Sequence, residues 1–152
     1  MKNLIATAGT TLAIFLFAVC LSTHAEVHLP AIFSDGMVMQ QQTHANLWGT
    51  ATPNKKVTVR TSWDGKLYAA TADKQGAWKL TVSTPEAGGP YTVTFDDGTP
   101  KVLSNILIGE LWLCSGQSNM EMPMKGFKNQ PVENANMDIL RSRNPELRLF
   151  TV

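Results

Sequence analysis

Hydrophobic and polar residues alternate along most of the chain between Val27 and about Leu107, which is the pattern of half-buried β-strands. Residues 57–72 give the clearest unit, with two alternating runs on either side of Asp64-Gly65. An Asp-Gly pair between such runs favours a hairpin turn, because both turn positions adopt positive φ. Further alternating runs follow without a helical period between them. The pattern predicts an antiparallel β-sandwich over residues 26–105.

The hydrophobic pattern changes near residue 106. Nearly continuous apolar runs at 106–108 and 111–114 predict a strand that is buried on both faces. After a loop, Pro131 and the helical spacing of the apolar residues that follow it predict a helix. Apolar positions at 147–152 then predict a second strand. Strand, loop, helix and strand in this order indicate the beginning of an α/β domain over residues 106–152.

The first 25 residues have the pattern of an export signal. Lys2 supplies the positive charge, residues 12–21 are an unbroken apolar run, and we expect cleavage after Ala25. Ten apolar residues are too few to span a bilayer, which needs about 20, so we expect no integral membrane segment in the mature chain. A lipoprotein processed at Cys20 is disfavoured by the bulky Val19 before it. We therefore expect a periplasmic or extracellular protein.

Composition and charge exclude several classes of protein. The 152 residues include 13 Lys and Arg against 12 Asp and Glu, so the chain lacks the basic excess expected of a nucleic-acid-binding protein. An apolar content of 43% is too high for a disordered tail. Cys114, the one cysteine beyond the signal, is expected to be a buried small hydrophobe. Asp96-Asp97-Gly98 is interpreted as a turn, and we expect no metal site or cofactor.

Residues 109–124 carry the candidate chemistry. Ser118 follows the expected buried strand, and ligands of open α/β sheets bind outside the carboxyl ends of the strands. Gly116 lets the backbone come close to a ligand, and backbone N–H groups around Ser118 are candidates for binding an oxyanion. Met120 rules out the Gly-x-Ser-x-Gly elbow. An alternative remains open, because Ser118 and Glu121 also fit a helix capping box.

Three blocks of the sequence resemble one family. Residues 113–121, Leu-Cys-Ser-Gly-Gln-Ser-Asn-Met-Glu, are similar to the first sequence block of SGNH-type hydrolases in the sialate O-acetylesterase branch. Residues 29–40 resemble the usual opening of that family, and the similarity continues through residues 88–93. The resemblance implies a secreted esterase that removes O-acetyl groups from sugars, with a β-sandwich beside an SGNH-type α/β/α domain. It also implies that Ser118 is the nucleophile and that its N–H is an oxyanion donor.

The rest of the family's catalytic machinery has no counterpart in the sequence. The family takes its general base and acidic partner from an Asp-x-x-His block, which does not occur here. We interpret His28 and His44 as surface or turn residues of the sandwich. General base assistance contributes roughly 10²- to 10⁴-fold, so we expect an N-terminal fragment of an esterase that is inactive alone. The alternative is a non-catalytic carbohydrate-binding or interaction module.

Three tryptophans are candidates for a sugar-stacking face under that alternative. Trp63 and Trp78 occupy positions that alternate inward among Val, Leu and Tyr residues, so core packing is the favoured interpretation for both. Trp48 belongs to a separate short strand, for which the alternation gives no such indication.

Overall fold

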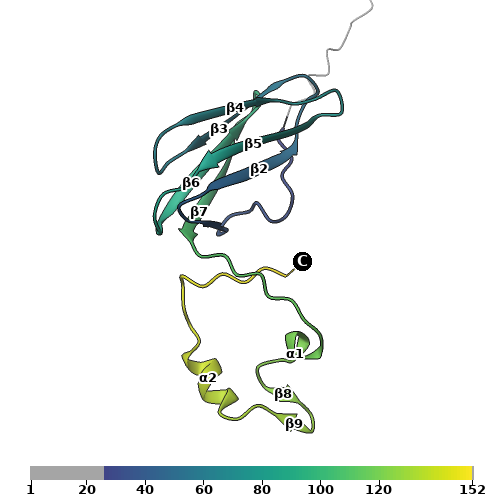
Figure 1. Ribbon diagram of the computed structural model, residues 1–152, viewed down its shortest axis with the longest axis vertical. Coiled ribbons are helices and arrows are strands. Elements are labelled where there is room, and N and C mark those ends of the chain that lie inside the picture. Colours follow the sequence, from purple (N-terminus) through teal and green to yellow (C-terminus); the bar gives the residue numbers. More distant parts are fainter. Residues whose placement is uncertain (1–25, 152) are drawn as a thin grey trace, which may run out of the picture.

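The computed structural model describes residues 26–151, and the expected export signal at 1–25 lies outside them (Figure 1). Two β-sheets make up residues 38–109. The larger sheet has five strands in the order β1 (Val38–Gln40), β7 (Lys101–Gly109), β6 (Gly88–Asp96), β3 (Lys56–Thr61) and β4 (Leu67–Thr71). The smaller sheet pairs β2 (His44–Thr50) with β5 (Ala77–Ser83). The expectation of a β-rich domain is confirmed.

The pair β3–β4 shows how the alternation in the sequence becomes a sheet face. Val57 lies opposite Ala70 and Val59 opposite Tyr68, so the apolar residues of both strands share one face, as predicted. The turn between them differs from the prediction. Strand β3 ends at Thr61 and β4 begins at Leu67, and of the Asp-Gly pair only the glycine has positive φ. The longer loop is stable because hydrogen bonds within it satisfy its polar side chains and backbone groups.

That loop is closed by a carboxylate. Asp64 accepts hydrogen bonds from the Thr61 hydroxyl at 2.5 Å, the Lys66 N–H at 3.0 Å and the Tyr68 hydroxyl at 3.1 Å. Burial raises the pKa of Asp64, but these hydrogen bonds outweigh it and leave the pKa below its ordinary value. The Asp64 carboxylate therefore holds the ends of β3 and β4 together, as a two-residue turn would do.

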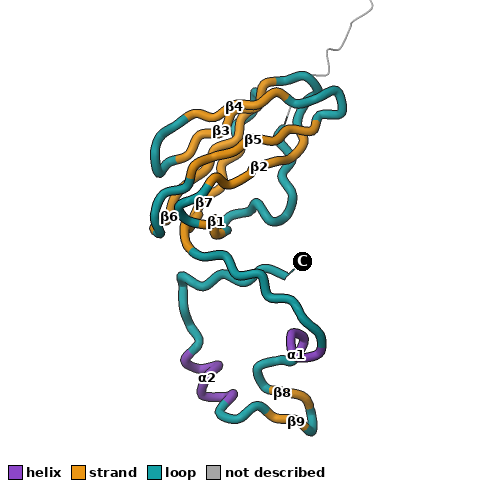
Figure 2. Tube along the Cα trace, viewed as in Figure 1, coloured by secondary structure: helices purple, strands orange, loops and turns teal. Residues whose placement is uncertain are grey.

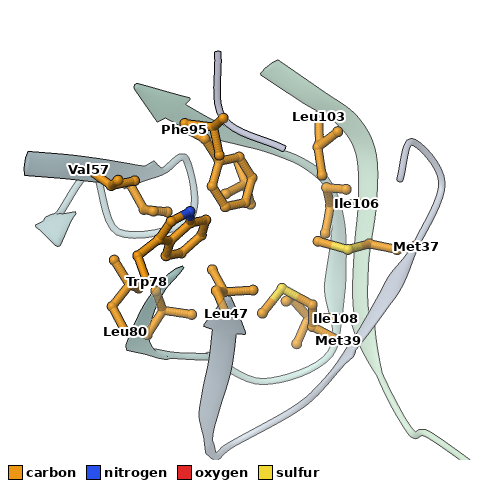
Figure 3. Packing of buried hydrophobic residues seen from close by; sticks show 14 of the residues in the cluster. Met37, Met39, Leu47, Val57, Trp78, Leu80, Phe95, Leu103, Ile106 and Ile108 are labelled. Carbon is orange, nitrogen blue, oxygen red and sulfur yellow. The ribbon is translucent and has the colours of Figure 1, made fainter. Parts of the chain in front are cut away.

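The hydrophobic core takes its side chains from both sheets (Figure 3). Leu47 and Trp78 come from the smaller sheet, and Val59, Phe95 and Ile106 come from the larger one. The rings of Trp78 and Phe95 lie 6.0 Å apart between their centroids. Burial of these apolar side chains in one shared cluster stabilises the domain through the hydrophobic effect.

One strand pair departs from the antiparallel expectation. Strands β1 and β7 run parallel, with Val38 opposite Leu107 and Gln40 opposite Gly109. The chain leaves the larger sheet after β1 and enters the smaller one at β2, so these consecutive strands belong to different sheets. Strand β1 consequently pairs with a strand that lies far away in the sequence, and the pair has no tight turn to impose an antiparallel direction.

Residues 110–151 form a second part with little regular structure (Figure 2). Its elements are α1 (Ser118–Glu121), β8 (Gly126–Phe127), β9 (Gln130–Pro131) and α2 (Ala135–Arg141). No helix within residues 26–151 is long and apolar enough to cross a membrane. The helix predicted after Pro131 begins at Ala135, because Pro131 pairs in β9 and Asn134 adopts the left-handed conformation with φ 58°.

The two strands predicted at 106–114 and 147–152 are formed only in part in the described residues. Residues 106–109 belong to β7, whereas 111–114 and 147–151 form no strand. Leu113 is 94% exposed and Leu149 89% exposed. A strand that is buried on both faces needs other elements packed over both faces, and these exposed segments have no such cover. The strand predictions are therefore wrong for 111–114 and 147–151, whereas 106–108 lies in a strand as predicted.

Candidate functional site

Ser118 is the first residue of the four-residue helix α1, which is reached from β7 through residues 110–117. Gln117 occupies the N-cap position, and its carbonyl accepts the Met120 N–H at 2.9 Å. Within the described chain α1 has no side-chain capping hydrogen bond, so the capping box of Ser118 and Glu121 is not made. Ser118 is exposed, which leaves its hydroxyl accessible to a reactant.

Gly116 allows a close approach of the backbone to α1. A Cβ atom at this position would lie 2.8 Å from the Met120 Cγ, so a larger residue would require the Met120 side chain or the preceding loop to shift. This neighbour belongs to the same chain, so the predicted close approach of the Gly116 backbone to a ligand stays a prediction. The proposed oxyanion role of the Ser118 and Gly116 backbone stays a prediction.

The two histidines of the described chain lie in the sheet region and form contacts there. The backbone of His28 exchanges two hydrogen bonds with Thr50, at 2.8 and 2.9 Å. His44 Nδ1 lies 3.3 Å from the Ser83 hydroxyl. Strand β2, which begins at His44, belongs to the sheet region, whereas α1 lies in the part that follows β7 (Figure 1). No hydrogen bond links Ser118 to a histidine or a carboxylate within residues 26–151.

A polar network that the sequence analysis did not single out surrounds Glu110, the residue after β7. Gln40 Nε2 donates to Glu110 Oε2 at 2.9 Å, and Gln41 Nε2 donates to Glu110 Oε1 at 2.6 Å. These hydrogen bonds, from Gln40 first and then Gln41, hold the pKa of Glu110 below its ordinary value. The signal in the sequence was the run of glutamines at 40–42, directly after an apolar strand.

A groove with a volume of about 750 Å³ lies beside this network. It is formed where the end of β7, the loop before β6 and residues 146–150 meet, and Trp112 and Cys114 contribute to its lining. Cys114 is exposed, which contradicts the expected burial. The physical reason is that residues 111–114 form no strand and are exposed, so Cys114 is not enclosed in a core.

Trp63 and Trp78 pack against the core, as the alternation predicted, whereas Trp48 is exposed. Trp78 is buried in the core, and the half-buried Trp63 donates its indole N–H to the Ser83 carbonyl at 2.9 Å. Trp48 is 43% exposed and packs edge-on against Phe33, with ring centroids 4.6 Å apart. Trp48 is therefore the tryptophan of the three that remains available to a ligand on the sheet region.

The acidic turn is formed by local hydrogen bonding. Asp96 Oδ1 accepts the Gly98 N–H at 2.7 Å, and the buried Asp97 accepts the Thr52 N–H at 3.3 Å. Residues 26–151 contain no group of three or more His, Cys, Asp or Glu side chains with the arrangement of a metal site. The interpretation of Asp96-Asp97-Gly98 as a turn is confirmed.

The chain is similar in structure to a known class of enzyme. The chain matches no protein-family model. It is similar in structure to a carbohydrate acetylesterase from Xanthomonas citri, with a TM-score of 0.70 and 30% identity, over 79% of this chain and 26% of that protein. Most of this chain therefore shares its fold with part of a carbohydrate acetylesterase.

Curated relatives give the family. The sialate O-acetylesterase of Homo sapiens is 30% identical over 114 residues, which is 69% of this chain and 22% of that protein. The sialate O-acetylesterase of Mus musculus is 31% identical over 127 residues, 76% of this chain and 23% of that protein. The chain belongs to the sialate O-acetylesterase family, and it spans about a fifth of the length of the curated relatives it matches.

Proposed function

We propose that this chain is part of an exported carbohydrate O-acetylesterase in which Ser118 is the acyl nucleophile. The observation that carries the proposal is the family relationship, at about 30% identity over most of the chain, to sialate O-acetylesterases. The exposed position of Ser118 at the start of α1, without a capping role, supports its assignment. The substrate class is an acetylated carbohydrate.

The chemistry is a two-step acyl transfer. Ser118 Oγ bonds to the acetyl carbon, the bond from that carbon to the sugar oxygen breaks, and the sugar hydroxyl leaves with the serine proton. Water then attacks the acetyl-serine, releases acetate and restores the hydroxyl. Backbone N–H groups at Ser118 and Gly116 are proposed to stabilise the oxyanion of each step.

The chain by itself is proposed to be inactive. Serine is a weak nucleophile without a general base, whose assistance contributes roughly 10²- to 10⁴-fold. Within the described residues Ser118 has no hydrogen-bonded histidine or carboxylate to act as that base. We further propose that residues 1–25 direct export, that the two sheets form a β-sandwich, and that residues 106–152 begin an SGNH-type domain.

The test is labelling with a fluorophosphonate, which reacts with activated serines, on the protein expressed from its complete gene. Wild type is expected to be labelled on Ser118 and the Ser118→Ala variant to stay unlabelled. Ser115→Ala is the matched control, because Ser115 is an exposed serine three residues earlier in the same segment. Labelling that persists in Ser118→Ala would overturn the assignment.

The proposed inactivity has its own test. The 152-residue chain is expected to hydrolyse p-nitrophenyl acetate no faster than its Ser118→Ala variant. Ser118-dependent release of p-nitrophenol by this chain would show that a base is present after all.

A carbohydrate-binding module is the second candidate function. The exposed Trp48 favours it, because an aromatic ring open to solvent is a surface on which a sugar ring can pack. Its test is calorimetric titration with acetylated sugars: binding that is lost in Trp48→Ala but kept in Ser118→Ala would support the module. Binding unaffected by Trp48→Ala would exclude this surface.

A further inference from the structure

Two neighbouring amides hold one carboxylate where β1, β6 and β7 meet. Each oxygen of Glu110 accepts a hydrogen bond from a different glutamine, Gln40 at 2.9 Å and Gln41 at 2.6 Å. The backbone is joined at the same place, because the Gln41 N–H donates to the Gly109 carbonyl at 2.8 Å. We call Gln40, Gln41 and Glu110 together the Glu110 anchor.

The orientation of both amides is fixed by the backbone. Gln40 Oε1 accepts the Leu111 N–H at 2.9 Å, and Gln41 Oε1 accepts the Ala87 N–H at 2.9 Å. Since each amide oxygen already binds a backbone donor, each amide must present its NH₂ group to residue 110. Residue 110 must then accept two hydrogen bonds and donate none, which an ionised carboxylate does and a carboxamide cannot.

The anchor lies at the start of the segment that leads to Ser118. Glu110 is the first residue after β7, and Ser118 follows eight residues later. Between them Leu111, Trp112 and Leu113 are exposed, and this stretch pairs with no described strand. The hydrogen bonds to Glu110 and Leu111 therefore fix the direction in which the segment leaves the sheet, and hydrogen bonds to a charged group are stronger than neutral ones.

We propose that Gln40, Gln41 and Glu110 are positioning residues that set the placement of the Ser118 segment relative to the β-sheets. The catalytic consequence rests on the proposed function, whereas the geometry of the anchor does not. A role confined to fold stability is the competing explanation. It predicts loss of the sheet core on mutation, whereas positioning predicts a local release of the segment with the core intact.

Glu110→Gln tests the anchor directly. The substitution keeps size and shape but replaces one acceptor oxygen by an NH₂ group, which would face the NH₂ group of a glutamine. That glutamine is expected to rotate and give up its backbone partner. In the isotopically labelled chain, the amide exchange of Leu111 or Ala87 is expected to accelerate by about tenfold, as the loss of a hydrogen bond worth about 1.4 kcal/mol would give. The core amide of Val93 is expected to be unchanged.

Glu86→Gln is the matched control. Glu86 is also an exposed carboxylate that accepts from a neighbouring glutamine, Gln42 Nε2 at 3.4 Å, but it does not contact Glu110. Its substitution is expected to leave the exchange of Leu111 and Ala87 at the wild-type rate. Wild-type protection of both amides in Glu110→Gln would overturn the anchor, and a loss of Val93 protection would show a structural role instead.

The positioning role is tested by kinetics on the protein expressed from its complete gene. Glu110→Gln is expected to lower kcat by about tenfold with little change in KM, since small misplacements of a reacting group can cost up to about 10²-fold. Glu86→Gln is expected to keep the wild-type kcat. Wild-type kcat in Glu110→Gln, with the segment released, would overturn the positioning role.

The same experiment separates the two proposals. If wild-type protein shows no Ser118-dependent activity or labelling, the proposed function fails. The hydrogen bonds of the Glu110 anchor are then still tested by amide exchange at Leu111 and Ala87. If Ser118-dependent activity is present and Glu110→Gln changes neither exchange nor kcat, the anchor fails and the proposed function stands.

Discussion

Replacing Phe95 by Ala should remove a central contact of the hydrophobic core. Phe95 is fully buried on β6, and its ring faces Trp78 of β5 across the core. Deleting a buried phenyl ring loses its transfer free energy and leaves a cavity, at a cost of about 3–5 kcal/mol. Domains of this kind have a free energy of unfolding of about 5–15 kcal/mol, so the variant is expected to be strongly destabilised.

The measurement is guanidinium chloride unfolding followed by tryptophan fluorescence. With a denaturant slope of about 3 kcal/mol per molar, a loss of about 4 kcal/mol lowers the midpoint by about 1.3 M. Ile106→Val, a milder change in the same core, is expected to cost about 1 kcal/mol and remains informative if Phe95→Ala does not fold.

Val102→Ala is the matched control, because Val102 lies on β7 but is 54% exposed. Its effect should stay within about 0.5 kcal/mol. Residues 112–151 should exchange their amide hydrogens quickly in wild type, since Ala135 is the one buried apolar residue found in that range. A midpoint shift for Phe95→Ala no larger than that of Val102→Ala would refute the assignment of the core.

Three further predictions concern single residues. Hydrogen bonds from the Ser104 N–H and then its hydroxyl lower the pKa of Asp35, so their stabilisation is present above the ordinary pKa of 3.8 and is lost as the pH falls through the lowered pKa. The difference in Tm between wild type and Asp35→Asn should accordingly shrink on acidification, and a difference that does not vary with pH would contradict this linkage. Gly49→Ala would place a Cβ 2.3 Å from the His28 carbonyl oxygen, and the strain should lower the Tm by about 10 °C, whereas an unchanged Tm would refute the close approach. Cys114 should react with a thiol reagent in the native chain, beyond any signal left in Cys114→Ser, and reaction only after unfolding would show that its segment is covered.

Much of the sheet region was predictable because strand faces are encoded locally. The alternation through Val57, Val59 and Tyr68 placed these residues on one face before any pairing was known, and their register confirms it. The candidate nucleophile was also a local feature, since the block around Ser118 resembles a family motif. The network at Glu110 was missed because Gln41 lies 69 residues away from it, and the run of glutamines at 40–42 does not by itself indicate its partner.

The sequence by itself determined the β-rich character of the chain, the inward faces of its strands, the family and the candidate serine, because periodicity and short motifs are properties of neighbouring residues. Only the tertiary structure decided that β1 pairs with β7 in parallel, that Cys114 is exposed, and that two glutamines orient the segment that leads to Ser118. These features depend on which distant segments meet. That choice is made by the burial of shared faces and the satisfaction of polar groups across the whole domain.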